Sequence, residues 1–361
     1  MAWIWEDIQR EWLAGSRVAA SPAETVAAFA LVEELLGRQW VESRHEHGGV
    51  RVTGSHPVAA VISMGRRLQA VRHASGIDTL LERIRAGDYA AHAELTAAYL
   101  CVPSDAPVAL EFGAPAQVGN RERVPDFRLR QEDEPWVYVE VTAPDISELQ
   151  HHAQILLEHL ATFLTDIPLG SAAEVMVRRD PTEEEVGTIV ETLRSQLQVA
   201  GPSQRDLPGL ALLLVRHAEP GQIVVEDHGE PNIPRIGLAR FELREGRGRH
   251  LAVRYAFSDQ RAEAFLTSEA RQLPRDTPGL VMVDVSRATG AFDAWQPLLA
   301  RRLRPRQHTR VSSITLFSSG MWGLPEGEAW VPWTWVLENR YATNSVPVWL
   351  TGRLRSWVAP R

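Results

Sequence analysis

Two stretches decide the fold, Val124-Pro125-Asp126-Phe127-Arg128-Leu129-Arg130 and, nine residues after it, Val139-Glu140-Val141-Thr142. Successive side chains of an extended strand point to opposite faces of the sheet. The apolar residues of each stretch therefore share one face, and Asp126 and Glu140 lie on the other. If the two strands are neighbours over one core, both carboxylates project from the same side of the sheet. Such a pair can bind a hard divalent cation through oxygen ligands.

The segments around these strands predict an α-β-β-β-α-β order, because helical apolar spacing and strand-like alternation follow one another. Asp88 is a typical residue to begin the helix before the first strand. The expected elements are helices at 77–84 and from Asp88 to about 100, strands at 108–112, 124–130 and 136–141, a helix at 146–164, a strand at 174–177 and a further helix at 181–198.

The two acidic residues and this order resemble the PD-(D/E)XK nuclease superfamily, which has the restriction-endonuclease-like fold. Pro125-Asp126 matches the "PD" of the motif, and Glu140-Val141-Thr142 stands at "(D/E)XK". Glu94, in the helix before the first strand, matches the upstream acid of the family. The resemblance covers about residues 77–180, under a third of the chain. In many family members the helix after the third strand turns a polar residue toward the site, and His151, His152 and Gln154 occupy that helix here.

The resemblance implies a nuclease that hydrolyses the phosphodiester bonds of nucleic acid, with DNA favoured over RNA. It implies Mg²⁺ or Mn²⁺ as the cofactor. The expected ligands are the carboxylates of Asp126 and Glu140, the main-chain carbonyl of Val141 and the carboxylate of Glu94.

Thr142 departs from the family, which usually has lysine at this position. No lysine can replace it, because all 38 basic residues are arginine. We expect Thr142 to position a water molecule and Arg128, on the neighbouring strand, to stabilise the transition state. A catalytically inactive module of the same fold, binding nucleic acid or protein, stays open as the alternative. So does a purely structural role, in which Glu140 forms a cross-strand ion pair with Arg128.

A second resemblance points to another class of enzyme. Leu214-Val215-Arg216-His217-Ala218-Glu219 is similar to the Arg-His signature of the histidine phosphatase family, and Ser258–Ala262 is similar to its later Ser-x-x-Arg-Ala stretch. A phosphoester hydrolase would use His217 as the nucleophile. The pattern is incomplete, because the apolar strand expected at 280–285 leads into Ser286-Arg287-Ala288 without the family's second histidine.

The fold class expected for the whole chain is α/β, with three parts. These are a helical N-terminal region at 1–75, the PD-(D/E)XK nuclease-like domain at 76–200 and a mixed α/β domain at 204–361. The boundary before the last part is placed at Gly201-Pro202-Ser203, a typical turn sequence. In that last part, Pro332 marks the strand at 330–336 as an edge strand.

Composition narrows the function classes. A length of 361 residues with 44% hydrophobic and 23% charged residues is typical of a soluble globular protein. A single cysteine, Cys101, excludes a disulfide framework and a cysteine-based zinc site. The lack of lysine excludes a Schiff-base enzyme and a P-loop. No signal-like or membrane-spanning segment stands out, so we expect a cytoplasmic protein without a membrane partner.

A basic cluster near the C-terminus is the candidate nucleic-acid patch. Its arginines can contact phosphates, or they can be the solvated end of a helix. A homodimer is compatible with everything in the sequence. The cluster consists of Arg301, Arg302, Arg304, Arg306 and Arg310.

Overall fold

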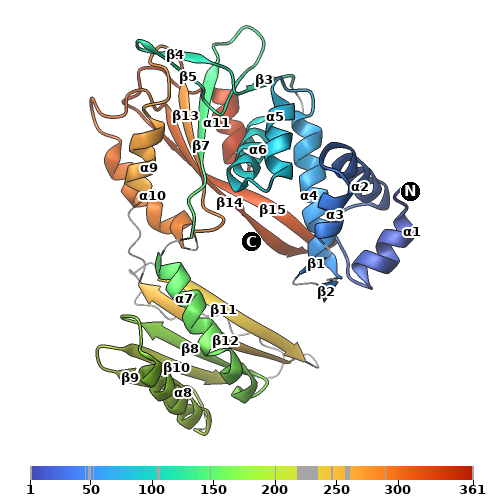
Figure 1. Ribbon diagram of the computed structural model, residues 1–361. Helices are drawn as coiled ribbons and strands as arrows, with labels where there is room; N and C mark the ends of the chain where they lie inside the picture. The colour runs from blue at the N-terminus through green and yellow to red at the C-terminus, as the bar shows by residue number, and fades with distance from the viewer. Residues whose placement is uncertain are drawn as a thin grey trace. The chain divides into compact units, whose positions relative to one another are not determined.

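The computed structural model describes residues 2–359 with several gaps, and the chain forms two compact units (Figure 1). Unit 1 consists of Met1–Pro144, Arg261–Ser286 and Gln296–Arg361, and unit 2 of Asp145–Gln260 and Arg287–Trp295. In the described part, no helix combines the length and the apolar character needed to cross a membrane. The residues left out of the description are 45, 48–49, 52, 104–105, 147, 200, 218–234, 245–246, 257–260 and 289.

Helices dominate the first hundred residues of unit 1, as the sequence predicts. The Ser21 hydroxyl accepts a hydrogen bond from the Glu24 N–H at 3.2 Å and so begins α2. Asp88 begins α6 in the same way, through the N–H of Ala90 at 2.9 Å. The elements are α1 (Trp5–Asp7), the π-helix η1 (Ile8–Leu13), α2 (Pro22–Leu36), α3 (Arg38–Ser43), the short hairpin of β1 (Glu46–His47) and β2 (Val50–Arg51), α4 (Ser55–Val71), α5 (Ile77–Arg85) and α6 (Tyr89–Cys101).

A six-stranded mixed sheet with the order β15-β14-β13-β7-β6-β3 lies at the centre of unit 1. Strands β3, β6 and β7 form an antiparallel meander, β13 runs parallel to β7 and to β14, and β15 is an edge strand that contains Pro332. The strands are β3 (Ala109–Phe112), β6 (Phe127–Arg130), β7 (Val137–Thr142), β13 (Gly279–Asp284), β14 (Ser313–Leu324) and β15 (Gly327–Glu338), with a separate hairpin of β4 (Ala116–Val118) and β5 (Arg121–Arg123).

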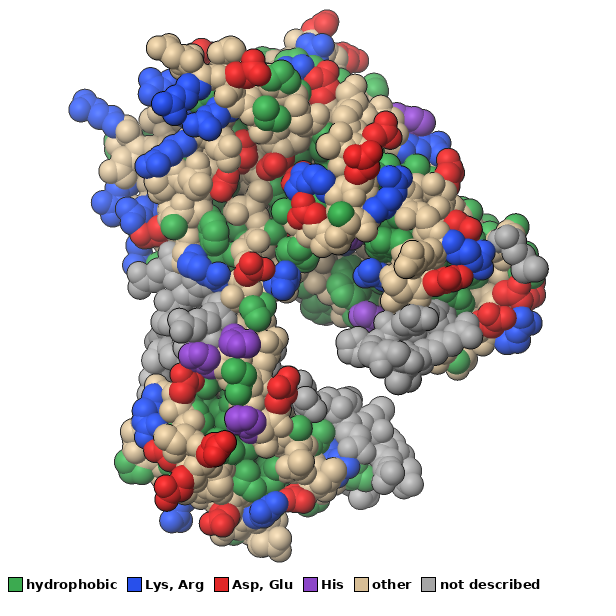
Figure 2. All heavy atoms as spheres, in the orientation of Figure 1, with side chains coloured by type: hydrophobic (Ala, Val, Ile, Leu, Met, Phe, Trp, Pro, Cys, Tyr) green, Lys and Arg blue, Asp and Glu red, His purple; other side chains and the backbone are tan. Residues whose placement is uncertain are grey.

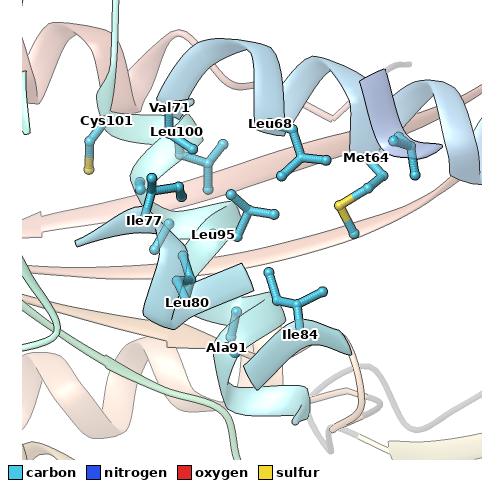
Figure 3. Close-up of a cluster of buried hydrophobic side chains, with 14 of the residues drawn as sticks. Met64, Leu68, Val71, Ile77, Leu80, Ile84, Ala91, Leu95, Leu100 and Cys101 are labelled. Carbon is cyan, nitrogen blue, oxygen red and sulfur yellow. The ribbon is translucent and has the colours of Figure 1, made fainter. Parts of the chain in front are cut away.

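One face of this sheet carries the apolar residues that the sequence assigns to it. Phe127, Leu129, Val137 and Val139 are fully buried in one core with the N-terminal helices. Figure 3 shows the helical side of that core, where leucine, isoleucine and methionine side chains of α4, α5 and α6 point toward one another. Three helices, α9 (Ala262–Glu269), α10 (Ala291–Arg302) and α11 (Val348–Arg355), belong to the C-terminal half of the chain.

The strand that follows β7 in the sheet comes from much later in the sequence than expected. The predicted helix at 146–164 and strand at 174–177 form α7 (Glu148–His159), η2 (Ala161–Asp166) and β8 (Ser171–Val177), and all of them belong to unit 2. In unit 1 the next helix along the chain is α9, and β13 pairs with β7. The α-β-β-β-α-β order therefore recurs as α6-β3-β6-β7-α9-β13, with residues 145–260 inserted after β7.

Unit 2 has its own five-stranded sheet, with the order β11-β12-β8-β10-β9. Apolar residues of α7 and α8 and of the three central strands form its core. Its division from unit 1 differs from the expected boundary at Gly201, because β9 continues the same sheet beyond that glycine. The remaining elements are α8 (Glu183–Leu197), β9 (Ser203–Leu207), β10 (Ala211–His217), β11 (Arg235–Arg244) and β12 (Arg247–Ala256). The strand expected near 222–225 lies outside the described residues.

Gly65 allows α2 and α4 to pack closely. A Cβ at this position would lie 2.7 Å from the Cβ of Ala28 and 2.9 Å from its Cα. Gly65→Ala should therefore push the two helices apart and lower the free energy of unfolding by about 1–2 kcal/mol. Urea denaturation measures this change. Gly187→Ala is the control, because its Cβ meets nothing within 4 Å; equal effects at both positions would contradict the close packing.

Candidate active site

Asp126 and Glu140 lie across from each other on neighbouring strands. Phe127 is the register partner of Val139, so Asp126, one residue before β6, stands opposite Glu140 on β7. The Val141 N–H donates a hydrogen bond to Asp126 Oδ2 at 2.6 Å, and the Asp126 carbonyl accepts one from the Gly113 N–H at 2.9 Å. The main chain on both sides therefore holds Asp126 in place. The register therefore places the two residues opposite each other, as the alternation of side chains predicts.

Glu140 is almost completely enclosed, with 3% of its surface exposed. In the part of the chain that the structure describes, its Oε1 atom is buried and has no hydrogen-bond partner. A buried carboxylate oxygen without a partner is costly, so proteins usually pair it. The Oε1 atom of Glu140 departs from that rule.

Arg128 does not supply that partner, so the cross-strand Glu140–Arg128 ion pair considered from the sequence is wrong. The Arg128 guanidinium lies 2.5 Å from Glu111 Oε2, donates to the Tyr138 hydroxyl at 3.2 Å and lies over the Trp136 ring at 4.4 Å. Glu111 lies directly opposite Arg128 on the neighbouring strand β3, which explains why Arg128 pairs with Glu111. The role of Arg128 in stabilising a transition state stays a prediction, and the guanidinium would have to leave Glu111 to perform it.

Burial and repulsion by neighbouring carboxylates raise the pKa of both carboxyl groups. For Asp126 the main cause is burial, followed by the charge of Glu94, while the hydrogen bond from Val141 opposes the shift in pKa. For Glu140 the causes of the raised pKa are burial and then the charges of Asp126 and Glu269. A divalent cation would remove both the repulsion and the cost of burying negative charge.

Glu94 reaches the same neighbourhood from α6 but is already bound. Arg83, on α5, holds it through two contacts, Nη1 to Oε2 at 2.8 Å and Nη2 to Oε1 at 2.7 Å. The same arginine also contacts Asp88 at 2.7 Å. Burial raises the pKa of Glu94, and the Arg83 charge opposes this rise. As a metal ligand, Glu94 would first have to exchange Arg83 for the cation.

Glu269 is a fourth carboxylate that the sequence did not indicate. It ends α9, which packs against β7, and its Oε2 accepts a hydrogen bond from Gln272 at 3.0 Å. Its charge contributes to the raised pKa of both Asp126 and Glu140. Residue spacing gave no signal, because Glu269 is brought to the site only through the insertion of residues 145–260. Arg83 was also missed, because its contact with the site is an ion pair with Glu94, which residue spacing does not reveal.

The carboxylates of Asp126 and Glu140 would suit a hard divalent cation that takes only a few of its ligands from the protein. Among the described residues, no group of three or more His, Cys, Asp or Glu side chains is placed to hold a metal ion together. Two carboxylates completed by water and substrate oxygens are nevertheless a usual arrangement for Mg²⁺. Thr142 is half-buried two residues after Glu140, on the same face of β7. The residues present therefore fit Mg²⁺ or Mn²⁺ at Asp126 and Glu140.

The basic cluster lies at the end of α10 and in the loop after it. Arg301, Arg302, Arg304 and Arg306 are exposed, and Arg302 forms an ion pair with Glu263 on α9. Arg310 is half-buried and donates to the Leu273 carbonyl at 3.4 Å. Figure 2 shows arginine side chains gathered on the side of unit 1 where Figure 1 places α9 and α10. The binding of nucleic acid here stays a prediction.

The histidines singled out from the sequence all lie in unit 2. His217 ends β10, is exposed, and its Nδ1 lies 2.8 Å from Ser171 Oγ. Most of Ser258–Ala262, needed for the phosphatase resemblance, lies outside the described residues. His151, His152 and Gln154 are on α7, not on the helix that precedes β13. His152 contacts Asp180 at 2.7 Å and lines a cavity of about 220 Å³ within unit 2.

In comparisons with known proteins, no family model, curated protein or solved structure matched the chain.

Proposed function

We propose that the protein is a divalent-metal-dependent nuclease with a restriction-endonuclease-like core in unit 1. The observation that carries the proposal is the enclosed Oε1 atom of Glu140, which has no hydrogen-bond partner among the described residues, on the residue that stands opposite Asp126. The α6-β3-β6-β7-α9-β13 order supports it, because it repeats the element order of the PD-(D/E)XK family around the two acids. The cofactor would be Mg²⁺ or Mn²⁺, and the substrate nucleic acid, with DNA favoured.

Each residue of the proposed site would have its own role. Asp126, fixed by the Val141 N–H, and Glu140 would hold the cation, together with the Val141 carbonyl. The cation would lower the pKa of a water molecule and would neutralise part of the negative charge on the phosphate. Thr142, at the end of β7, would orient water through its hydroxyl. Arg83 would keep the Glu94 carboxylate near the pair without adding a further uncompensated negative charge.

A cleavage assay with wild-type protein tests the proposal. Plasmid DNA, DNA oligonucleotides and RNA are incubated with Mn²⁺, with Mg²⁺ or with EDTA, beside the double variant Asp126→Ala/Glu140→Ala. We expect cleavage by the wild type with Mn²⁺ or Mg²⁺ and none in EDTA, because the pair of carboxylates is the proposed binding site of the cation. Cleavage that survives in the double variant, or an absence of cleavage on every substrate, would contradict the proposal.

Two observations favour a second candidate, an inactive module of the same fold that binds nucleic acid or protein. Thr142 replaces the usual lysine, and within the described residues no third acidic side chain is positioned to share a cation with the pair. This candidate predicts binding of an oligonucleotide in EDTA that is unchanged by Mn²⁺ and is never followed by cleavage. Measurements on the same preparation therefore separate the two functions.

A further inference from the structure

A stripe of polar side chains follows one face of α6, on the side away from Glu94. Tyr89, His92, Thr96 and Tyr99 recur at the spacing of one helical face. Thr96 is buried and the three ring side chains are half-buried, so the stripe is partly open to solvent. Because Glu94 is two residues from His92, it lies on nearly the opposite side of the helix. One helix therefore carries the acid on one side and these polar groups on the other.

Arg67, on the neighbouring helix α4, lies against this stripe. Its Nη1 donates a hydrogen bond to Thr96 Oγ1 at 2.9 Å, and that hydroxyl donates to the His92 carbonyl at 2.8 Å. These two bonds fix the guanidinium over one turn of α6. Its Nε atom is buried and finds no hydrogen-bond acceptor among the described residues. A buried guanidinium N–H without an acceptor is costly, as is a buried carboxylate oxygen without a donor.

Asp284 is the carboxylate whose charge acts most on Arg67, but both of its oxygens accept hydrogen bonds from other groups. Its Oδ1 accepts the Ser286 N–H at 2.9 Å, and its Oδ2 accepts the Tyr89 hydroxyl at 3.2 Å. Burial is the main cause that lowers the pKa of Arg67, and the Asp284 charge only partly opposes it. The positive charge of Arg67 is therefore not balanced by a direct ion pair with Asp284.

A second arginine adds positive charge near the same stripe. Arg44 lies over the Trp40 ring at 4.4 Å, and the Trp40 ring stacks on the His92 ring at 6.4 Å between centroids. Burial and then the charges of Arg67 and Arg44 lower the pKa of His92 to about 4. A neutral imidazole with an N–H and two guanidinium groups are donors suited to an oxyanion.

We infer that Arg67 and the polar face of α6 bind a phosphate group of a nucleic-acid backbone. The site offers two guanidinium groups and a neutral imidazole N–H, so the single negative charge of a phosphodiester suits it better than the double charge of a free phosphate does. The open Nε of Arg67 is the donor for one phosphate oxygen, and the guanidinium geometry suits such oxygens. The choice of nucleic acid as the source of the phosphate rests on the proposed function. The oxyanion site itself does not.

Binding of fluorescent DNA oligonucleotides, single- and double-stranded, in EDTA tests the inference without cleavage. We expect Arg67→Gln to weaken binding about tenfold, the loss of a charge-assisted contact. Arg66→Gln is the matched control, because the adjacent Arg66 is paired with Glu24 at 2.7 Å and should leave the affinity within about twofold. Equal affinities of the two variants would overturn the inference. Binding of inorganic phosphate at millimolar concentration, by a protein that does not bind the DNA oligonucleotides, would assign the site to a free anion instead and also overturn it.

Arg44→Gln provides a second test in case Arg67→Gln does not fold, which circular dichroism will show. Arg44 has an exposed side chain, and its loss should weaken DNA binding about threefold and reduce the salt dependence of the affinity. An unchanged affinity would count against the site. Because these measurements exclude metal, DNA binding without cleavage in Mn²⁺ would defeat the proposed function alone. Cleavage by Arg67→Gln with an unaltered KM would defeat this inference alone.

Discussion

Asp126→Asn should reduce Mn²⁺-dependent cleavage about 10³-fold. Asparagine keeps the size of the side chain but removes the negative charge that faces Glu140, and it can still accept the Val141 N–H. A carboxylate that holds a catalytic cation contributes several kcal/mol to transition-state stabilisation, and about 4 kcal/mol corresponds to this fold-change. Single-turnover cleavage of a labelled oligonucleotide measures it, and titration with Mn²⁺ shows whether the cation is lost as well.

The matched control for this change is Glu111→Gln. Glu111 is an acid of the same sheet, but its partner is Arg128 and not the carboxylate pair. Its loss should change the cleavage rate less than about tenfold, because only an indirect effect through Arg128 remains. If Glu111→Gln and Asp126→Asn lower the rate equally, the effect is one on sheet stability and the assignment of Asp126 as a ligand fails.

Glu140→Gln should make the metal-free protein more stable by about 2–3 kcal/mol at pH 8. Burial raises the pKa of Glu140 in the folded protein, so the folded chain keeps a proton that the unfolded chain has already lost. Stability therefore falls as the pH rises above about 4.3, the unfolded value, and goes on falling until the folded pKa is passed. Glutamine does not ionise, so this loss is absent in the variant.

Urea denaturation at pH 4 and pH 8 measures this effect. The variant and the wild type should differ little at pH 4 and most at pH 8. Saturating Mn²⁺ should reverse the order at pH 8, because the cation stabilises only the protein that still has the carboxylate. A Glu140→Gln protein that is less stable than wild type at both pH values would show that the carboxylate is held by a favourable interaction after all.

The sequence was sufficient for features that depend on short spacing. Alternation along β6 and β7 placed Phe127 and Val139 in the core and the two acids on the opposite face, and the register of the strands agrees. The cap of α6 at Asp88 and the edge position of Pro332 follow from local chemistry in the same way. In each case the decisive interaction lies within a few residues or within one hairpin.

Features that depend on distant pairing were out of reach. The helix and the strand that come directly after β7 in the sequence match the expected element order, so the sequence assigns them to the same sheet. In the structure β7 pairs instead with β13, more than 130 residues later. Sequence periodicity does not distinguish an inserted unit from the continuation of a domain. For the same reason Glu269 was missed. Arg128 has a neighbouring strand on each side, with Glu111 on β3 and Glu140 on β7. The alternation of side chains along β6 does not tell which of the two acids Arg128 will pair with.

The insertion after β7 has a consequence for the order in which the chain is assembled during translation. Most of unit 2 is one continuous stretch, Asp145–Gln260, so its core can form soon after those residues leave the ribosome. The central sheet cannot close until β13 has been synthesised, and contacts between such remote segments form slowly. Until then one hydrogen-bonding edge of β7, the strand that carries Glu140, remains unpaired and prone to associate with other chains.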